Sequence, residues 1–248
     1  MEDVGEHHVP PGPLAVRWLG YELEPPQAGA LTRARVALEN AGTSAWRGLN
    51  LSYHWLDDRG NPIVWDGLRY EVEAAPAERL ERDLQLRGPI PPGRYRLAFD
   101  LVDEHRFWLA EVGNVELGIE VDVAPRDAGA ARTFLPAEAE PDGDWEHRVR
   151  AAHAEGYAAV GGSLDLRGGH LKRTPPELEP YAPGGGRNPG FAHPLVCPSL
   201  LPPLEPNTEV AGLPAWRPEG DEPWIYDGRI RLRLRLRLRP RLRSRKPP

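Results

Sequence analysis

The sequence of 248 residues contains a single cysteine, Cys197, and only two lysines. One cysteine can form neither an intramolecular disulfide nor a multi-cysteine metal site. No stretch approaches the ~20 consecutive apolar residues that a membrane-spanning helix requires. The acidic, proline-rich segment 1–13 lacks the basic and apolar regions of a signal peptide. We therefore expect a cytoplasmic protein in a reducing compartment, without a transmembrane segment.

The spacings that are typical of metal sites and catalytic nucleophiles are also missing. His147 and His153 are six residues apart and do not share a helix face, as a ligand pair spaced i, i+4 would. Ser163 follows two glycines, but Asp165 stands where a Gly-x-Ser-x-Gly motif needs glycine. Cys197 lies in an apolar segment, which favours an inert thiol. We expect no cofactor, no metal ion and, on balance, no catalytic centre.

Positive charge is scarce outside the C-terminus. Ten basic and no acidic residues lie between Arg229 and Lys246, so the remainder has 21 basic and 37 acidic residues, a net charge of −16. An acidic body repels nucleic acid and anionic membranes, which leaves the segment 229–246 as the candidate for non-specific contact with anions. Its alternation of arginine with leucine or isoleucine suits a strand. From the sequence we prefer the alternative, a low-complexity tail.

Hydrophobic residues alternate with polar residues from Ala15 to Val123. Because successive side chains on a strand point to opposite faces, each segment is predicted to bury one side and to expose the other to water. Ser52 and His54 lie on the polar side of one such segment, and Asp100 on that of another.

Turn sequences separate these alternating segments, among them Asn40-Ala41-Gly42 and Pro91-Pro92-Gly93. About seven to nine short strands with this spacing predict an antiparallel sandwich. Four large aromatic side chains are predicted to fill its core: Trp18, Trp46, Trp55 and Phe99.

Three strings carry a resemblance to a known class of domain: Asn40-x-Gly42-x-x-x-Trp46, Tyr53-x-Trp55-x-Asp57-x-x-Gly60 and Asp66-Gly67-Leu68-Arg69. With Pro92-Gly93-x-Tyr95-x-Leu97 they resemble bacterial immunoglobulin-like β-sandwich accessory domains. Such domains accompany glycosyltransferases and other cell-envelope polysaccharide proteins. The resemblance covers residues 14–125 and implies an immunoglobulin-like sandwich in which Tyr95 closes one edge. It implies a function only weakly, because this fold has many functions.

The fold class that we expect is mainly β, an antiparallel immunoglobulin-like sandwich followed by a small α/β or loop-rich, Pro/Gly-rich extension. One helix is predicted to begin at Asp144 and to end at Gly156. The predicted organisation is a disordered N-terminus (1–13), the sandwich (14–125), a linker (126–143), a poorly autonomous region with one helix and loops (144–228) and a basic Arg-Leu tail (229–248).

Aromatic residues beside hydrogen-bond acceptors near strand ends are the candidate ligand site: Trp65, Asp66, Asp103, His105 and Trp108. This pattern suits carbohydrate, since sugar C–H groups stack on aromatic faces and sugar hydroxyls need polar partners. The loops at the ends of a sandwich are where such folds bind ligands. In the alternative that we prefer, Trp65 and Trp108 plug the ends of the sandwich.

The sequence favours a non-catalytic binding or spacer module, with a glycan or a protein as partner, and it leaves the oligomeric state open. The competing hypothesis is a fragment of a sugar-nucleotide glycosyltransferase. Gly156-Tyr157-x-x-Val160-Gly161-Gly162 resembles a strand–turn of those enzymes, and Asp142-Gly143-Asp144 has the form of their acidic metal-binding pair.

Overall fold

The computed structural model describes residues 1–135, 139–167, 195–196, 199–210, 213–218 and 220–235. The described residues form two compact units. The first consists of Met1–Asp127 with Ala154–Gly156, and the second contains Ala128–His153 and the described residues from Tyr157 onward.

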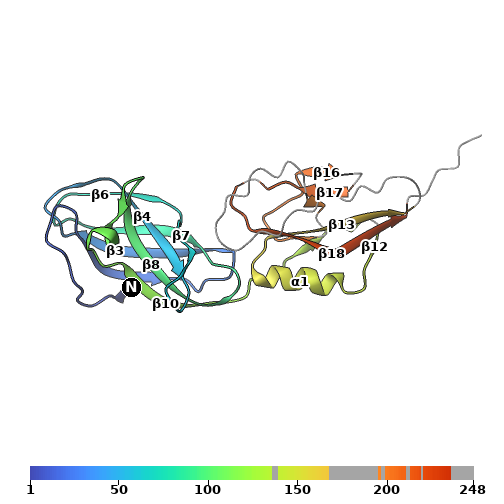
Figure 1. Cartoon of the computed structure of the whole chain (residues 1–248), viewed down its shortest axis with the longest axis horizontal. Helices are drawn as coiled ribbons and strands as arrows, with labels where there is room; N and C mark the ends of the chain where they lie inside the picture. Colours follow the sequence, from blue (N-terminus) through green and yellow to red (C-terminus); the bar gives the residue numbers. More distant parts are fainter. Residues whose placement is uncertain (136–138, 168–194, 197–198, 211–212, 219, 236–248) are drawn as a thin grey trace, which may run out of the picture. The chain divides into compact units, whose positions relative to one another are not determined.

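The first unit is a sandwich of two antiparallel sheets (Figure 1). One sheet has the order β1 (Glu2–Asp3), β2 (Val16–Leu23), β3 (Leu31–Asn40) and β7 (Arg79–Arg87). The other has the order β10 (Leu117–Val123), β8 (Gly93–Asp103), β4 (Trp46–Leu56) and β5 (Pro62–Val64). Two further strands extend the second sheet, because β6 (Tyr70–Ala74) pairs with β4 and β9 (Phe107–Trp108) pairs with β8. The prediction of a mainly β chain with an antiparallel sandwich is confirmed.

The core lies between these two sheets and contains side chains from both. Val36 of β3 is fully buried, and Tyr53 of β4 is nearly so. The four aromatic residues expected to fill the core are all among its largest buried side chains: Trp18, Trp46, Trp55 and Phe99. Burial of such rings is the main stabilising contribution in a sandwich without a disulfide.

Tyrosine and tryptophan side chains form hydrogen bonds with backbone groups at the edges of the two sheets. Tyr95 Oη donates a hydrogen bond to the carbonyl oxygen of Pro91 at 2.6 Å, which closes one edge as the sequence resemblance implies. Between the sheets, Trp55 Nε1 donates to the carbonyl oxygen of Arg87 at 2.9 Å. The amide of the same arginine donates to Tyr53 Oη at 2.9 Å. These bonds satisfy polar atoms that would otherwise be buried without a partner.

The outer face of the β4–β8 pair departs from the predicted pattern. Ser52, His54 and Asp100 point away from the core, yet all three are buried. The prediction that this side is exposed to water is wrong here, because other parts of the first unit cover it. The covering parts are residues 65–69, Trp108 and the 3-10 helix η1 (Leu109–Val112).

The second unit contains a mixed five-stranded sheet. Its order is β11 (Arg132–Thr133), β15 (Ser199–Leu200), β13 (Ala159–Arg167), β18 (Trp224–Arg235) and β12 (Ala139–Pro141). The central strands β13 and β18 run parallel. A second sheet has the order β14 (Leu195–Val196), β17 (Leu213–Trp216) and β16 (Thr208–Val210). Both β11 and β12 lie in the segment 126–143.

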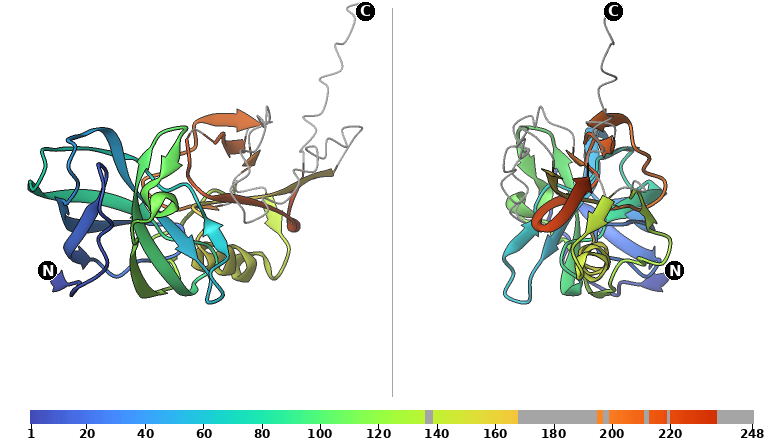
Figure 2. Two further views of the ribbon diagram at one scale, coloured as in Figure 1. Left: turned by 60° about the vertical axis from the view of Figure 1, so that its left-hand side comes forward. Right: turned by 90° about the vertical axis from the view of Figure 1, so that its right-hand side faces the viewer.

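One helix, α1 (Trp145–Glu155), packs on the mixed sheet, and its residues up to His153 belong to the second unit. Val149 of the helix is buried with Val160 of β13 and Ile230 of β18. Ala159, the residue of β13 before Val160, belongs to a separate hydrophobic cluster that also contains Trp216 of β17. Figure 2 shows α1 and the β16–β17 pair on opposite sides of the mixed sheet. The helix that the sequence predicts between Asp144 and Gly156 is present as α1.

Residues 229–235 form the second half of β18. Ile230 and Leu232 are buried, whereas Arg229 and Arg231 are exposed, so this part of the Arg-Leu run has the alternation of a strand. The aliphatic face has a place to pack, because Ile230 contacts the cluster beneath α1. The remaining residues of the run, 236–248, and Cys197 lie outside the described residues. No helix among the described residues has the length and apolar character to cross a bilayer.

Candidate functional site

The outer face of β4 and β8 forms the base of the candidate site. In this ladder Ser52 stands opposite Asp100, and His54 stands opposite Ala98. All four residues are buried. A buried row with a hydroxyl, an imidazole and a carboxyl group requires hydrogen-bond partners, and residues outside the two strands supply them.

Two tryptophans hold the imidazole of His54. The ring of Trp65 stacks on it with centroids 4.1 Å apart and an interplanar angle of 21°. The ring of Trp108 meets it edge-on, with centroids 4.2 Å apart, and the two indoles lie 6.1 Å from each other. Aromatic pairs in these arrangements contribute about 0.5–1.5 kcal/mol each beyond the burial of their area. We refer to His54, Trp65 and Trp108 as the aromatic cluster.

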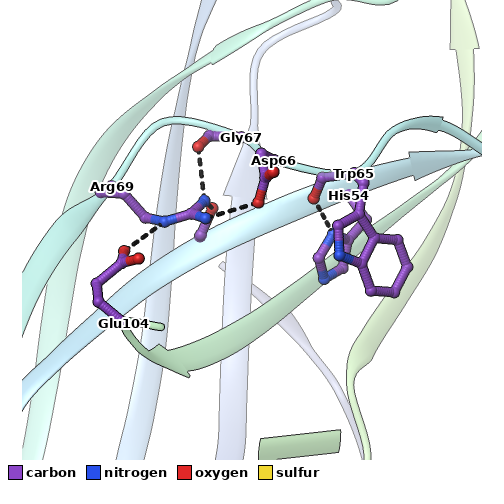
Figure 3. Close-up of polar contacts among 7 residues, drawn as sticks. His54, Trp65, Asp66, Gly67, Arg69 and Glu104 are labelled. Carbon is purple, nitrogen blue, oxygen red and sulfur yellow. Dashed lines mark hydrogen bonds and ion pairs between the residues drawn. The ribbon is translucent and has the colours of Figure 1, made fainter. Parts of the chain in front are cut away.

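A hydrogen bond fixes the orientation of this imidazole as well. Nδ1 of His54 donates to the carbonyl oxygen of Trp65 (Figure 3). Burial lowers the pKa of His54, so the ring is neutral at pH 7 with its proton on Nδ1. His54 thus supports the Trp65 ring by stacking and the Trp65 backbone by hydrogen bonding.

The segment that carries Trp65 lies directly on β4. The amide of Gly67 donates to the carbonyl oxygen of Tyr53 at 3.1 Å. A Cβ atom at position 67 would lie 2.6 Å from that oxygen and 2.7 Å from the Tyr53 ring. Only glycine allows so close an approach, and the approach sets the height of Trp65 above the sheet.

Arg69 binds this segment to its surroundings through several hydrogen bonds (Figure 3). Its Nε donates to Glu104 Oε1 at 2.7 Å, and its Nη2 donates to Asp66 Oδ1 at 2.8 Å. Its Nη1 donates to Ser52 Oγ at 2.7 Å and to the carbonyl oxygen of Gly67 at 2.8 Å. The guanidinium carbon also lies 4.8 Å from the ring centroid of Trp108. These contacts join the sheet, residues 65–69 and the β8–β9 turn.

Asp100 anchors the other side of the site. Its carboxylate accepts hydrogen bonds from the amides of Leu101 at 2.7 Å and of Ala110 at 3.1 Å. Ala110 belongs to η1, which follows directly after Trp108. The pKa of Asp100 is raised to about 7, chiefly by burial and also by the nearby carboxylates Glu116 and Glu111, although the two amide hydrogen bonds oppose this rise.

The exposed part of the site combines an aromatic face with carboxylate oxygens. Trp65 is 47 % exposed although His54 covers one of its faces, so part of the ring that His54 does not cover is accessible to water. The side chains of Asp66 and Glu104 are 72 % and 38 % exposed. Each uses one oxygen for Arg69, and within the described chain no contact is recorded for the second oxygen. The arrangement suits a ligand that has a flat apolar face and hydroxyl groups at its rim.

The structure brings together three of the five residues expected from the sequence. Trp65 and Trp108 belong to the aromatic cluster, and Asp66 joins them through Arg69. Trp108 is buried, as the alternative of a plug requires, whereas Trp65 is not.

The other two expected residues lie in the turn between β8 and β9. The carboxylate of Asp103 forms an ion pair with Arg106 at 2.5 Å. His105 is exposed and has a left-handed backbone conformation with φ 63°. No contact between His105 and the aromatic cluster is recorded among the described residues.

Sequence reasoning missed His54, Arg69 and Glu104 as members of the site. For His54 the sequence did contain a signal, because it is the one aromatic side chain on the polar side of the segment 49–55. Its partner Trp65 is eleven residues away along the chain, and no periodicity links the two positions.

One carboxylate of the acidic pair in the competing enzyme hypothesis makes a structural contact. Asp144 Oδ2 forms an ion pair with Arg148 at 2.7 Å, which lowers the pKa of that carboxyl group. The side chains of Asp165 and Ser163 lie outside the described set. No cluster of metal-binding side chains is found in the part of the chain that the structure describes.

Comparisons with known proteins give fold likenesses at low similarity. No protein-family model matches the chain, and no curated protein matches it. Among solved structures, the C-terminal domain of wzt matches over 47 % of this chain and 76 % of its own, with 9 % identity and a TM-score of 0.35. A β-glucosidase from Listeria innocua in complex with isofagomine matches over 44 % of this chain and 16 % of its own, with 13 % identity and a TM-score of 0.30. Similarity at this level assigns no function, so the functional argument depends on the geometry of the site.

Proposed function

We propose that the first unit is a non-catalytic carbohydrate-binding module, which recognises or positions a glycan by stacking a sugar ring on the open face of Trp65. The exposure of Trp65 is the observation that supports this most directly. A tryptophan that only closed the end of the sandwich would be buried, as Trp108 is. Trp65 instead has one face covered by His54 and is still 47 % exposed, which leaves ring surface for a sugar.

The rigidity of this ring favours binding. Stacking on His54, the edge contact with Trp108 and the seating of Gly67 on β4 hold Trp65 in place before any ligand arrives. A side chain that is already ordered loses little conformational entropy on binding, so more of the contact energy appears as affinity.

The polar groups beside the ring suit a sugar as well. The second oxygens of Asp66 and Glu104 are acceptors, and each sugar hydroxyl is a donor. Arg69 fixes both carboxylates, which therefore present their acceptors in a defined geometry. The sequence resemblance to accessory domains of polysaccharide systems supports the same ligand class and a role in glycan or envelope biosynthesis.

The test is a glycan array with the full chain, followed by calorimetric titration of the glycans that bind. Stacking a sugar on Trp65 buries on the order of 100 Å² of apolar area, so Trp65→Ala should weaken binding by about 10- to 100-fold. The matched control is Leu31→Ala, because Leu31 is 45 % exposed on the other sheet. That control should keep wild-type affinity.

Two results would contradict the proposal. One is the absence of any bound glycan on the array. The other is a glycan whose affinity is the same for the wild type and for a folded Trp65→Ala variant, because such a glycan would bind elsewhere.

A further inference from the structure

We infer that the ligand of the Trp65 site is uncharged, so that the site selects hydroxyl-rich neutral sugars against sugars with a carboxylate, sulfate or phosphate group. This inference rests on the proposed function and specifies the substrate class of the same site. It follows from the charges around Trp65 and from how each of them is already paired.

The cation closest to the open ring has little capacity for an anionic ligand. Arg69 has five N–H donors, and four of them are used within the protein. Two of these bonds go to carboxylates, which neutralise its charge, and its plane lies over Trp108. An anionic sugar could approach only the remaining N–H, on Nη2, unless it displaced Asp66 or Glu104.

The neighbouring arginines are committed in the same way. Arg96 is the next outer-face residue along β8 after Ala98, and its Nη2 lies 2.6 Å from Glu116 Oε1. Arg106, in the β8–β9 turn, pairs with Asp103 and lies over the ring of Phe107. The described residues include no lysine. Each of the three arginines that lie around the site is therefore already paired with a carboxylate.

The free acceptors at the rim have the opposite sign. The second oxygens of Asp66 and Glu104 belong to partly exposed carboxylates that are ion-paired with Arg69. They accept hydrogen bonds from hydroxyl groups, whereas a carboxylate, sulfate or phosphate has no proton to donate and is repelled. The Trp65 site thus combines attraction for neutral sugars with a repulsive element against acidic ones.

Matched pairs of sugars test the inference because they share the stacking face and differ in charge. The full chain is titrated with methyl glucoside and methyl glucuronide, with methyl galactoside and methyl galacturonide, and with oligomers of each where the monomers bind weakly. We expect the neutral member to bind at least about tenfold more tightly in low salt. Added salt should narrow this difference, because it screens the repulsion of the acidic member.

A charge-removing variant locates the cause. Asp66→Asn with Glu104→Gln should lower the discrimination within a pair, because both acidic groups at the rim are gone. Asp83→Asn is the matched control, since Asp83 is an exposed carboxylate on the other sheet that also pairs with an arginine. The control should leave the discrimination unchanged.

The outcomes separate this inference from the proposed function. An acidic member that binds as tightly as its neutral partner, through Trp65, would overturn the inference and leave carbohydrate binding in place. A 2-amino sugar that binds more tightly than both would overturn it in favour of a cationic ligand. Absence of binding by every sugar, neutral or charged, would overturn both.

Discussion

The two faces of the β4–β8 pair share a backbone and differ in how they are buried. On the inner face Tyr53 stands opposite Phe99, and both pack among hydrophobic residues of the other sheet. On the outer face Ser52 stands opposite Asp100, and both are equally buried. The covering layer there is not a sheet. It consists of residues 65–69, Trp108 and η1.

The difference lies in what each face requires of its cover. The inner face needs apolar volume, which many combinations of side chains can supply. The outer face needs specific donors and acceptors, because a buried polar group without a partner costs about 1–3 kcal/mol. Arg69 for Ser52 and the Ala110 amide for Asp100 meet this need. A face organised by such contacts has a defined shape, which suits it to support the exposed Trp65.

The largest effect is expected from a cavity on the inner face. Phe99→Ala removes a fully buried ring from the centre of the core and should lower the free energy of unfolding of the first unit by about 3–5 kcal/mol. Amide hydrogen exchange of the β4 and β8 residues, measured as a function of denaturant concentration, gives this free energy of unfolding. Leu31→Ala, at an exposed position, should change stability by less than about 0.5 kcal/mol. A loss below about 1 kcal/mol for Phe99→Ala would show that these strands do not share one core.

On the outer face the loss should come from polar contacts rather than volume. Arg69→Met keeps the apolar stem but removes the hydrogen bonds to Ser52, Gly67, Asp66 and Glu104. We expect a loss of roughly 1–3 kcal/mol in the same assay, since the buried hydroxyl of Ser52 loses its partner.

The matched control for Arg69 is Arg35→Met, which breaks an exposed pair with Asp83. Exposed pairs contribute about 0–1 kcal/mol, so this variant should remain near the wild type. Equal losses for the two arginines would mean that the contacts of Arg69 are ordinary surface contacts, and the contrast between the two faces would fail.

The same contrast explains how far the sequence alone could lead. Alternation between Ala15 and Val123 predicted the sandwich and its core aromatics, because period two encodes which side of a strand is apolar. It could not predict that Ser52, His54 and Asp100 are buried, since their cover comes from segments whose positions depend on tertiary contacts. Trp65 and Asp66 were expected at the site from their types, whereas the roles of His54 and Arg69 depend on where the Gly67 segment lies.

A pH-dependent test sharpens the comparison at Asp100. Burial raises the pKa of this group from 3.8 to about 7, so between these values the folded protein keeps a proton that the unfolded chain has lost. Stability therefore falls as pH rises through this window. Relative to Asp100→Asn, which does not titrate, wild-type stability should fall by up to about 2 kcal/mol from pH 5 to pH 7 and become level above pH 8.

An exposed carboxylate on the other sheet gives the opposite sign. The hydrogen bond from Arg35 lowers the pKa of Asp83, so the stabilisation by Asp83 is present above its unfolded pKa and is lost as the pH falls below it. Asp83→Asn compared with the wild type should show this trend. If Asp100→Asn showed it too, Asp100 would be a solvated carboxylate and the outer face would be open to water.

A smaller change in stability than that of Phe99→Ala is expected where we propose the largest change in binding. Trp65→Ala removes a ring that is 47 % exposed, so little hydrophobic burial is lost beyond its contacts with His54 and Trp108. Two aromatic contacts of about 0.5–1.5 kcal/mol each are lost, so the free energy of unfolding should fall by about 1–3 kcal/mol. The ring of His54, which is buried in the wild type, would then be more accessible to water. The NMR chemical shifts of its ring protons would report this change. A loss as large as that for Phe99→Ala would make Trp65 a core residue of the outer layer, and the exposure of its second face would no longer indicate a ligand.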